Sequence, residues 1–206
     1  MKRRKLNMTE KWFPYIEVES SNGVREVSLA TRHLMNRKIF LQGDIDSYVA
    51  GSIMSQLMFL EDESTDPVSI YINSLGGEVN AGLLIYDAMQ ACKAPINTIC
   101  SGYAASMAAI ILAGGEKGHR FIFPHSKVMI HEPLISGGAG GSATSIKNIS
   151  DSILETRDIV NGILAGHTGK TLEEINSATR YDNYMNAEEA ISFGICDLIS
   201  PAMSID

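Results

Sequence analysis

The chain of 206 residues lacks most features that mark secreted, membrane-bound or nucleic-acid-binding proteins. It has only three cysteines, an odd number without metal-ligand spacing, which indicates reduced core residues in a cytosolic protein. These are Cys92, Cys100 and Cys196. No apolar run approaches the roughly 18 residues that a membrane helix needs. The net charge is −7, and lysine and arginine cluster only at residues 1–5, so nucleic acid is not an expected partner.

Sequence signatures of targeting and cofactor binding are also missing. The basic residues 1–5 are followed by polar residues rather than an apolar stretch, which is not the pattern of a secretory signal. The chain has no zinc-ligand spacing, phosphate-binding loop or dinucleotide-binding fingerprint. We therefore expect a cytoplasmic protein with no metal, no cofactor and no membrane partner. The 45% hydrophobic content is enough for one sizeable core.

Strand and helix patterns alternate in the middle of the chain. Residues 68–73 and 96–100 are typical of buried strands, and a short turn and an apolar helical pattern follow each of them. Repeated strand–turn–helix units predict a parallel sheet. Right-handed crossovers then bring the strand ends and helix starts to one edge, where α/β proteins bind ligands. We expect residues 74–77 and 104–107 to lie on that edge.

The flanking segments predict further elements. Residues 20–23 are a plausible hairpin turn, and Asp44 is expected to cap a helix at residues 45–61. Helical spacing returns downstream in a long helix that ends near residues 166–169. Thr171 and the glutamate three residues later match a capping box for a second, shorter helix.

Ser106 lies between small residues, directly ahead of the apolar run at residues 107–113. A serine at the start of a buried helix lies beside unpaired backbone N–H groups and the positive end of the helix dipole. That environment suits a nucleophile whose attack creates an oxyanion. On these residues alone, a packing helix with an incidental serine is an equal alternative.

A base and an orienting carboxylate would complete a hydrolytic triad. Of the five histidines, His131 stands out because it ends an apolar strand and can project into a cleft. The plainer alternative is a histidine whose hydrogen bonds are satisfied at the edge of the core and which has no catalytic role. Four downstream aspartates could orient the ring, and spacing does not choose among them. They are Asp151, Asp158, Asp182 and Asp197.

Four segments, read in order, resemble the ClpP serine proteases. They are Tyr71-Ile72-Asn73-Ser74-x-Gly76-Gly77, Gly102-x-Ala104-Ala105-Ser106-Met107-Ala108, Met129-Ile130-His131-x-Pro133 and Asp182-x-Tyr184-Met185-x-Ala187-x-Glu189-Ala190. The resemblance implies an α/β, crotonase/ClpP-like fold of repeated ββα units over residues 16–200. It also implies a protruding handle of strand and helix at about residues 135–165, with residues 1–15 as an axial or processed N-terminal segment.

The resemblance also implies a role for each site residue. Ser106 would be the nucleophile, His131 the general base and Asp182 the residue that orients His131. The backbone N–H groups of Gly77 and Met107 would form the oxyanion hole. A glycine-rich strand would lie beside bound peptide and pair with its backbone. Its expected substrate-binding residues are Gly137, Gly138, Gly140 and Gly141.

The function implied is the proteolytic subunit of a barrel-shaped, ATP-dependent protease that cleaves unfolded polypeptides to short peptides. Members form heptameric rings that stack into a tetradecamer. ATP is used by a partner AAA+ unfoldase of the ClpX, ClpC or ClpA type, not by this chain. A crotonase-type acyl-CoA enzyme is disfavoured, because Ser106, His131 and Asp182 together meet no requirement of enolate chemistry.

Several departures from the family pattern support an alternative. Leu75 stands where the family usually has proline, and Tyr181 stands where it commonly has an arginine that bridges the rings. In the family's docking pocket for ATPase loops, Tyr71 and Ile99 are kept, whereas three positions have small residues. These are Ser69, Ala91 and Ser101. The alternative is a divergent, weakly active or non-catalytic ring subunit that needs a second ClpP paralogue for assembly and ATPase docking.

Overall fold

A mostly parallel β-sheet forms the centre of the protein in the computed structural model, which describes residues 14–20, 23–135 and 140–200. The main strand order is β3–β4–β5–β6–β9, and all four pairings are parallel. The bounds are β3 (Lys38–Gln42), β4 (Val68–Ser74), β5 (Ile96–Ala105), β6 (Arg120–Ile122) and β9 (Leu198–Ile199). The predicted parallel sheet is therefore confirmed.

Two more strands extend the sheet beyond the end of β6. Strand β7 (Lys127–Ile130) runs parallel to the last residues of β5, and β8 (Asn183–Met185) pairs antiparallel with β7. The backbone of β5 turns at Gly102, where the side chain of Asn73 accepts a hydrogen bond from the Tyr103 N–H at 3.1 Å. This turn lets one long strand pair first with β6 and then with β7.

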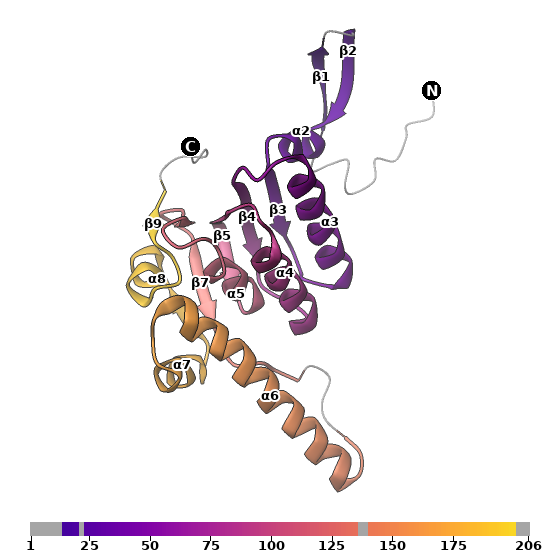
Figure 1. Cartoon of the computed structure of the whole chain (residues 1–206). Coiled ribbons are helices and arrows are strands. Elements are labelled where there is room, and N and C mark those ends of the chain that lie inside the picture. The colour runs from indigo at the N-terminus through magenta and orange to yellow at the C-terminus, as the bar shows by residue number, and fades with distance from the viewer. Residues whose placement is uncertain (1–13, 21–22, 136–139, 201–206) are drawn as a thin grey trace, which may run out of the picture.

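Three helices cover the same face of the sheet (Figure 1). They are α3 (Ser47–Glu63), α4 (Val79–Ala91) and α5 (Met107–Ala113). Helix α4 packs between α3 and α5. Every residue of α5 is buried, as the apolar run at residues 107–113 predicts. The main core lies between these helices and the strand residues that face them.

The remaining elements lie around this core. Strands β1 (Tyr15–Ser20) and β2 (Gly23–Ser28) form the predicted antiparallel hairpin, followed by α2 (Leu29–Met35). Helix α6 (Ala143–Thr168) projects away from the sheet, and its buried residues are all in its C-terminal half (Figure 1). Helices α7 (Leu172–Thr179) and α8 (Ala187–Phe193) follow it. The predicted capping box at Thr171 is present. None of the helices in the described ranges is long and apolar enough to cross a membrane.

The predicted start of α3 is wrong by two residues. The cap is Asp46, not Asp44, and its side chain accepts a hydrogen bond from the Val49 N–H at 2.8 Å. Ile45 lies outside the helix because it forms a parallel bridge with Gly77. Its N–H donates to the Gly76 carbonyl at 2.9 Å, and its carbonyl, which a helix would need, accepts from the Glu78 N–H at 2.8 Å. A contact distant in sequence therefore sets this boundary. The bounds expected for the N-terminal segment and the handle stay predictions.

A buried ion pair joins the two strands at the β9 edge of the sheet. The Arg120 guanidinium donates to both carboxylate oxygens of Asp197, at 2.9 and 2.6 Å, and its side chain is only 4% exposed. It also donates to the carbonyls of Ala113 and His167. Burial by itself raises the pKa of the Asp197 carboxyl, but the hydrogen bonds and charge of Arg120 outweigh it, so this pKa lies below its ordinary value.

Replacing Asp197 by alanine is expected to lower the free energy of unfolding by about 3–5 kcal/mol near neutral pH, because a buried cation loses its partner. Since the folded-state pKa of Asp197 is lowered, its contribution is complete above the unfolded pKa of about 3.9 and is lost as the pH falls through the folded value. Denaturant unfolding at several pH values measures both effects.

The matched control is Lys93→Ala, which breaks the exposed ion pair with Glu61 and should cost no more than about 1 kcal/mol. A loss of similar size in the two variants would contradict the role given to the buried pair.

Candidate active site

Ser106 occupies the sharp junction between β5 and α5. Its backbone has φ 54° and ψ −124°. Residues other than glycine rarely adopt such a positive φ. The Ser106 N–H donates to the Met129 carbonyl of β7 at 2.9 Å, which holds the junction against the sheet. A serine on a strained strand-to-helix turn is the geometry in which α/β hydrolases present a nucleophile. The strain itself was not predictable from the sequence.

Three predicted site residues are joined by hydrogen bonds. His131 Nε2 lies 2.9 Å from Ser106 Oγ, and His131 Nδ1 lies 3.1 Å from Asp182 Oδ1. The pairing of β7 with β8 explains the second contact, because Ile130 opposes Asn183 and the next residue pair in this register is His131 with Asp182. The His131 side chain is 15% exposed, whereas that of Asp182 is 55% exposed.

The other candidates that sequence spacing left open lie elsewhere. Asp197 pairs with Arg120, and Asp151 and Asp158 each pair with a basic neighbour on the surface of α6. Of the histidines, His167 hydrogen-bonds the Tyr86 hydroxyl at 2.9 Å. Burial and the nearby Arg120 cation lower the pKa of His167. The structure thus brings His131 and Asp182 to Ser106.

Tyr184 is a neighbour of Asp182 to which the sequence assigned no role. Its hydroxyl donates to Asp182 Oδ2 at 3.4 Å, a long hydrogen bond. The negative charge of Asp182 raises the pKa of the Tyr184 phenol. The alternation of side chains along a strand places residues two apart on one face, and this spacing could have predicted the contact.

The turn after β4 packs directly against Ser106, as predicted for residues 74–77. Gly76 has φ +97°, and a Cβ there would lie 2.7 Å from both the Ala105 carbonyl oxygen and Ser106 Cβ. Gly77 has φ +156°, and a Cβ there would lie 2.2 Å from the Ile45 carbonyl oxygen. No side chain fits at either position. Of the two predicted oxyanion-hole residues, Met107 directly follows Ser106, whereas Gly77 is next to Gly76 and packs against Ile45. Their roles stay predictions.

An apolar cavity opens beside Ser106 and His131. Its lining comes from α4, α5, β7 and the C-terminal half of α6. The lining residues besides Ser106 and His131 are Val79, Met107, Ile110, Ile130, Pro133, Val160, Asn161 and Leu164. Asn161 is the only polar residue among these eight, and it was not identified from the sequence. The cavity's volume of about 20 Å³ has room for about one water molecule.

The predicted glycine-rich strand is only partly described. Gly137 and Gly138 lie outside the described residues. Gly140 and Gly141 are exposed and directly precede Ser142, which caps α6. Pairing of these glycines with a peptide stays a prediction. In the described ranges, no three histidine, cysteine or acidic side chains are grouped so that they could hold a metal ion.

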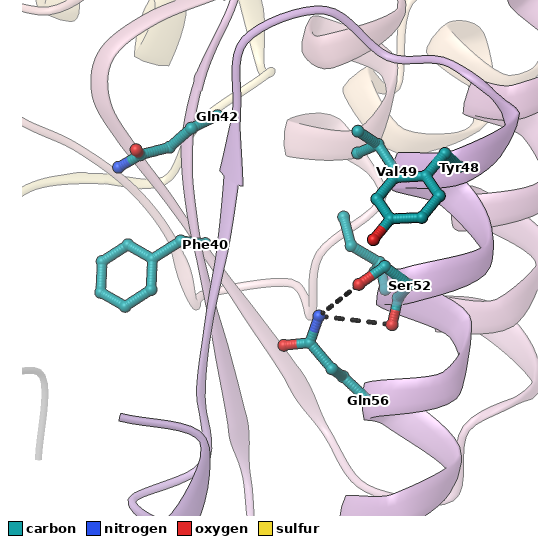
Figure 2. A pocket seen from close by; sticks show the side chains of 7 residues that line it. Phe40, Gln42, Tyr48, Val49, Ser52 and Gln56 are labelled. Atoms are coloured by element: carbon teal, nitrogen blue, oxygen red, sulfur yellow. Dashed lines mark hydrogen bonds between the residues drawn. The ribbon is translucent and has the colours of Figure 1, made fainter. Parts of the chain in front are cut away.

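A second hollow lies on the edge strand β3 and the first turns of α3 (Figure 2). Its lining includes Phe40 and Gln42 from β3 and Tyr48, Ser52 and Gln56 from α3. The Gln56 side-chain amide donates to Ser52, as drawn in Figure 2.

Phe40 also begins a row of apolar residues on the face of the sheet opposite the helices, here called the aromatic row. It consists of Phe40, Tyr71, Ile99 and Phe121, which oppose one another across four neighbouring strands. Tyr71 and Ile99, the two positions kept from the family's docking pocket, are both buried in this row.

The comparison of the chain with known protein families agrees with this fold. The family described as Clp protease matches residues 21–202, nearly the whole chain. The chain belongs to the Clp protease family, and its mixed α/β fold is ClpP-like. Membership supports a ClpP-type proteolytic subunit and confirms the resemblance found in the sequence motifs.

Replacing Gly76 by alanine is expected to destabilise the protein by more than the roughly 1–3 kcal/mol of backbone strain alone, because the new Cβ also meets the Ser106 junction. Gly118→Ala is the matched control, since Gly118 has φ +89° and open space around its Cβ position. Denaturant unfolding measures the loss of stability in both variants. The loss in Gly118→Ala gives the cost of backbone strain, and the additional loss in Gly76→Ala gives the cost of the clash with the Ser106 junction. Equal losses would contradict the packing role of Gly76.

Proposed function

We propose that this chain is a serine-type endopeptidase subunit that cleaves unfolded polypeptides to short peptides through Ser106, His131 and Asp182. The observation that carries the proposal is the hydrogen-bond chain from Ser106 Oγ to His131 Nε2 at 2.9 Å and from His131 Nδ1 to Asp182 at 3.1 Å. A nucleophile, a base within hydrogen-bond reach and a third group that orients the base are the parts that nucleophilic acyl transfer requires.

In the proposed reaction, Ser106 Oγ attacks the scissile carbonyl carbon while His131 Nε2 takes its proton. Asp182 accepts the Nδ1–H of His131, which fixes the tautomer and stabilises the imidazolium. His131 then gives the proton to the leaving amine, and water, activated by the same ring, hydrolyses the acyl-enzyme. Solvent exposure of Asp182 weakens its electrostatic effect, so its main contribution is to orient the ring.

The oxyanion of the tetrahedral intermediate would be stabilised by the backbone N–H groups of Gly77 and Met107. Met107 is the first residue of α5, where N–H groups have no acceptor within the helix. Gly77 follows Gly76, which packs against Ser106, and its N–H would be the second donor.

The mechanism predicts that a fluorophosphonate probe labels the assembled protein at Ser106. Ser106→Ala should lose the label and at least about 10³-fold in kcat for peptide hydrolysis. Ser101→Ala is the matched control, because this serine lies on β5, which leads to Ser106, and its hydroxyl donates to the Ile72 carbonyl. Absence of a Ser106-dependent label would instead support the non-catalytic ring subunit.

The proposed assembly is a tetradecamer of two stacked heptameric rings in the cytoplasm, served by an AAA+ unfoldase that uses ATP. Large apolar side chains that are exposed on α3 and α6 offer surface for contacts between subunits. On α3 these are Tyr48, Met58 and Phe59, and on α6 they are Ile146, Leu154 and Ile159. No metal or cofactor of the chain itself takes part in this proposal.

The second candidate, a divergent subunit that needs a ClpP paralogue, is favoured by specific positions. Small residues at Ser69, Ala91 and Ser101 reduce the apolar area that an ATPase loop would bury. Tyr181, where the family commonly has an arginine, is largely exposed and lies under the guanidinium of Arg180. Both features weaken contacts that a self-sufficient barrel would use.

Native mass and pull-down measurements distinguish the two assemblies. A homo-tetradecamer that captures an AAA+ unfoldase without another subunit is the result expected for the first candidate. A smaller species that captures the unfoldase only after mixing with a paralogue is the result expected for the second. Strong capture by the chain alone would rule out the second candidate.

A further inference from the structure

We propose that Tyr184 is a positioning residue whose hydroxyl holds the Asp182 carboxylate in the orientation in which that carboxylate meets His131. The inference deepens the proposed function and rests on it, because a positioning residue acts only through the reaction that it serves. Tyr184 acts on the carboxylate and not on the substrate.

Strand β8 places the Tyr184 side chain on the side of the sheet that holds the site. Tyr184 opposes Met129 of β7 in the antiparallel register, and the register continued beyond the last pair sets Asp182 opposite His131. Side chains two residues apart along a strand lie on the same face of the sheet. The pairing that brings Asp182 to His131 therefore also sets Tyr184 beside Asp182.

Each carboxylate oxygen of Asp182 has one partner. Oδ1 lies 3.1 Å from His131 Nδ1, and Oδ2 lies 3.4 Å from the Tyr184 hydroxyl. Among the described residues, these two are the only hydrogen-bond partners of the Asp182 side chain. An ionised carboxylate can only accept, so the Tyr184 hydroxyl is the donor.

The second contact matters because Asp182 is little constrained by its surroundings. Its side chain is 55% exposed, and the terminal torsion of an aspartate has broad minima. A carboxylate held at one oxygen alone can rotate and exchange its partner for water. A donor at Oδ2 resists that rotation and keeps Oδ1 directed at His131, whose tautomer and orientation depend on this acceptor.

The charge of Asp182 keeps the phenol in its donor form. The nearby carboxylate is the largest cause that raises the pKa of Tyr184 above its ordinary value, so the hydroxyl retains its proton at neutral pH. At 3.4 Å the hydrogen bond is long, and both groups are about half exposed. We therefore expect the effect of one modest hydrogen bond.

The test replaces Tyr184 by phenylalanine, which removes the hydroxyl and keeps the ring. The kcat for a short fluorogenic peptide, measured without an unfoldase, should fall by about three- to tenfold. The KM should stay within about twofold, because the hydroxyl acts on the orientation of the base and not on the bound peptide. The rate of fluorophosphonate labelling at Ser106 should fall by the same factor as kcat. Native mass of each variant checks that assembly is unchanged.

The matched control is Tyr181→Phe, which removes a phenol hydroxyl from the residue directly before Asp182. Tyr181 is 76% exposed, and its ring lies under the guanidinium of Arg180. Its variant keeps that ring and should retain kcat within about twofold. Equal losses in the two tyrosine variants would overturn the proposal.

A double-mutant cycle separates positioning from a structural role. In an Asp182→Ala background, Tyr184→Phe should change the labelling rate by less than about twofold, because its only route of action is gone. A structural role would give the same loss in both backgrounds. An unchanged kcat in Tyr184→Phe, a change confined to KM, or a full further loss in the Asp182→Ala background would each overturn the proposal.

The unmodified chain separates this inference from the proposed function. If it is labelled at Ser106 and cleaves the peptide, but Tyr184→Phe does the same at an equal rate, the role of Tyr184 alone is contradicted. If it shows no Ser106-dependent label, the proposed catalysis is contradicted, and with it the reaction that Tyr184 would serve.

Discussion

The candidate active site depends on the two pairings of β7. This strand ends its parallel pairing with β5 at Ala105 and Met129, and its antiparallel pairing with β8 at Ile130 and Asn183. Ser106, His131 and Asp182 are each one residue beyond these last pairs. Because successive side chains alternate between the faces of a strand, a shift of either pairing by one residue would turn a site residue to the opposite face. The site is thus a property of strand register.

Much of the fold could be predicted because its causes are local. The apolar runs, the glycine turns and the capping box at Thr171 act within a few residues, and each led to an element that the structure contains. The predicted N-terminus of α3 was wrong because its cause is a contact that is distant in the sequence. Asp44 and Asp46 are both good caps, and the choice between them is made by the bridge from Ile45 to Gly77, 32 positions later in the chain.

The candidate site likewise contains residues that local sequence identifies and residues that depend on distant contacts. Ser106 and His131 were recognisable from their neighbours, but four aspartates remained until the family resemblance favoured one. Asp182 owes its place to pairing between β7 and β8, which are far apart in the sequence. Asn161 could not be predicted, because an asparagine in an amphipathic helix carries no sign that α7 will cover it. The positive φ of Ser106 likewise has no local signature in the sequence.

The crowded turn after β4 limits how this part of the chain can vary over evolutionary time. Gly76 and Gly77 are adjacent positions closed to every side chain, one by the Ser106 junction and the other by Ile45. Leu75 immediately precedes them, yet its side chain is 65% exposed. Among these three residues of the turn, substitutions are therefore confined to position 75, which is exposed to solvent. At this position the chain has leucine in place of the proline usual in the family. A substitution at Leu75 can therefore change the surface next to the turn without disturbing the packing of Gly76 and Gly77.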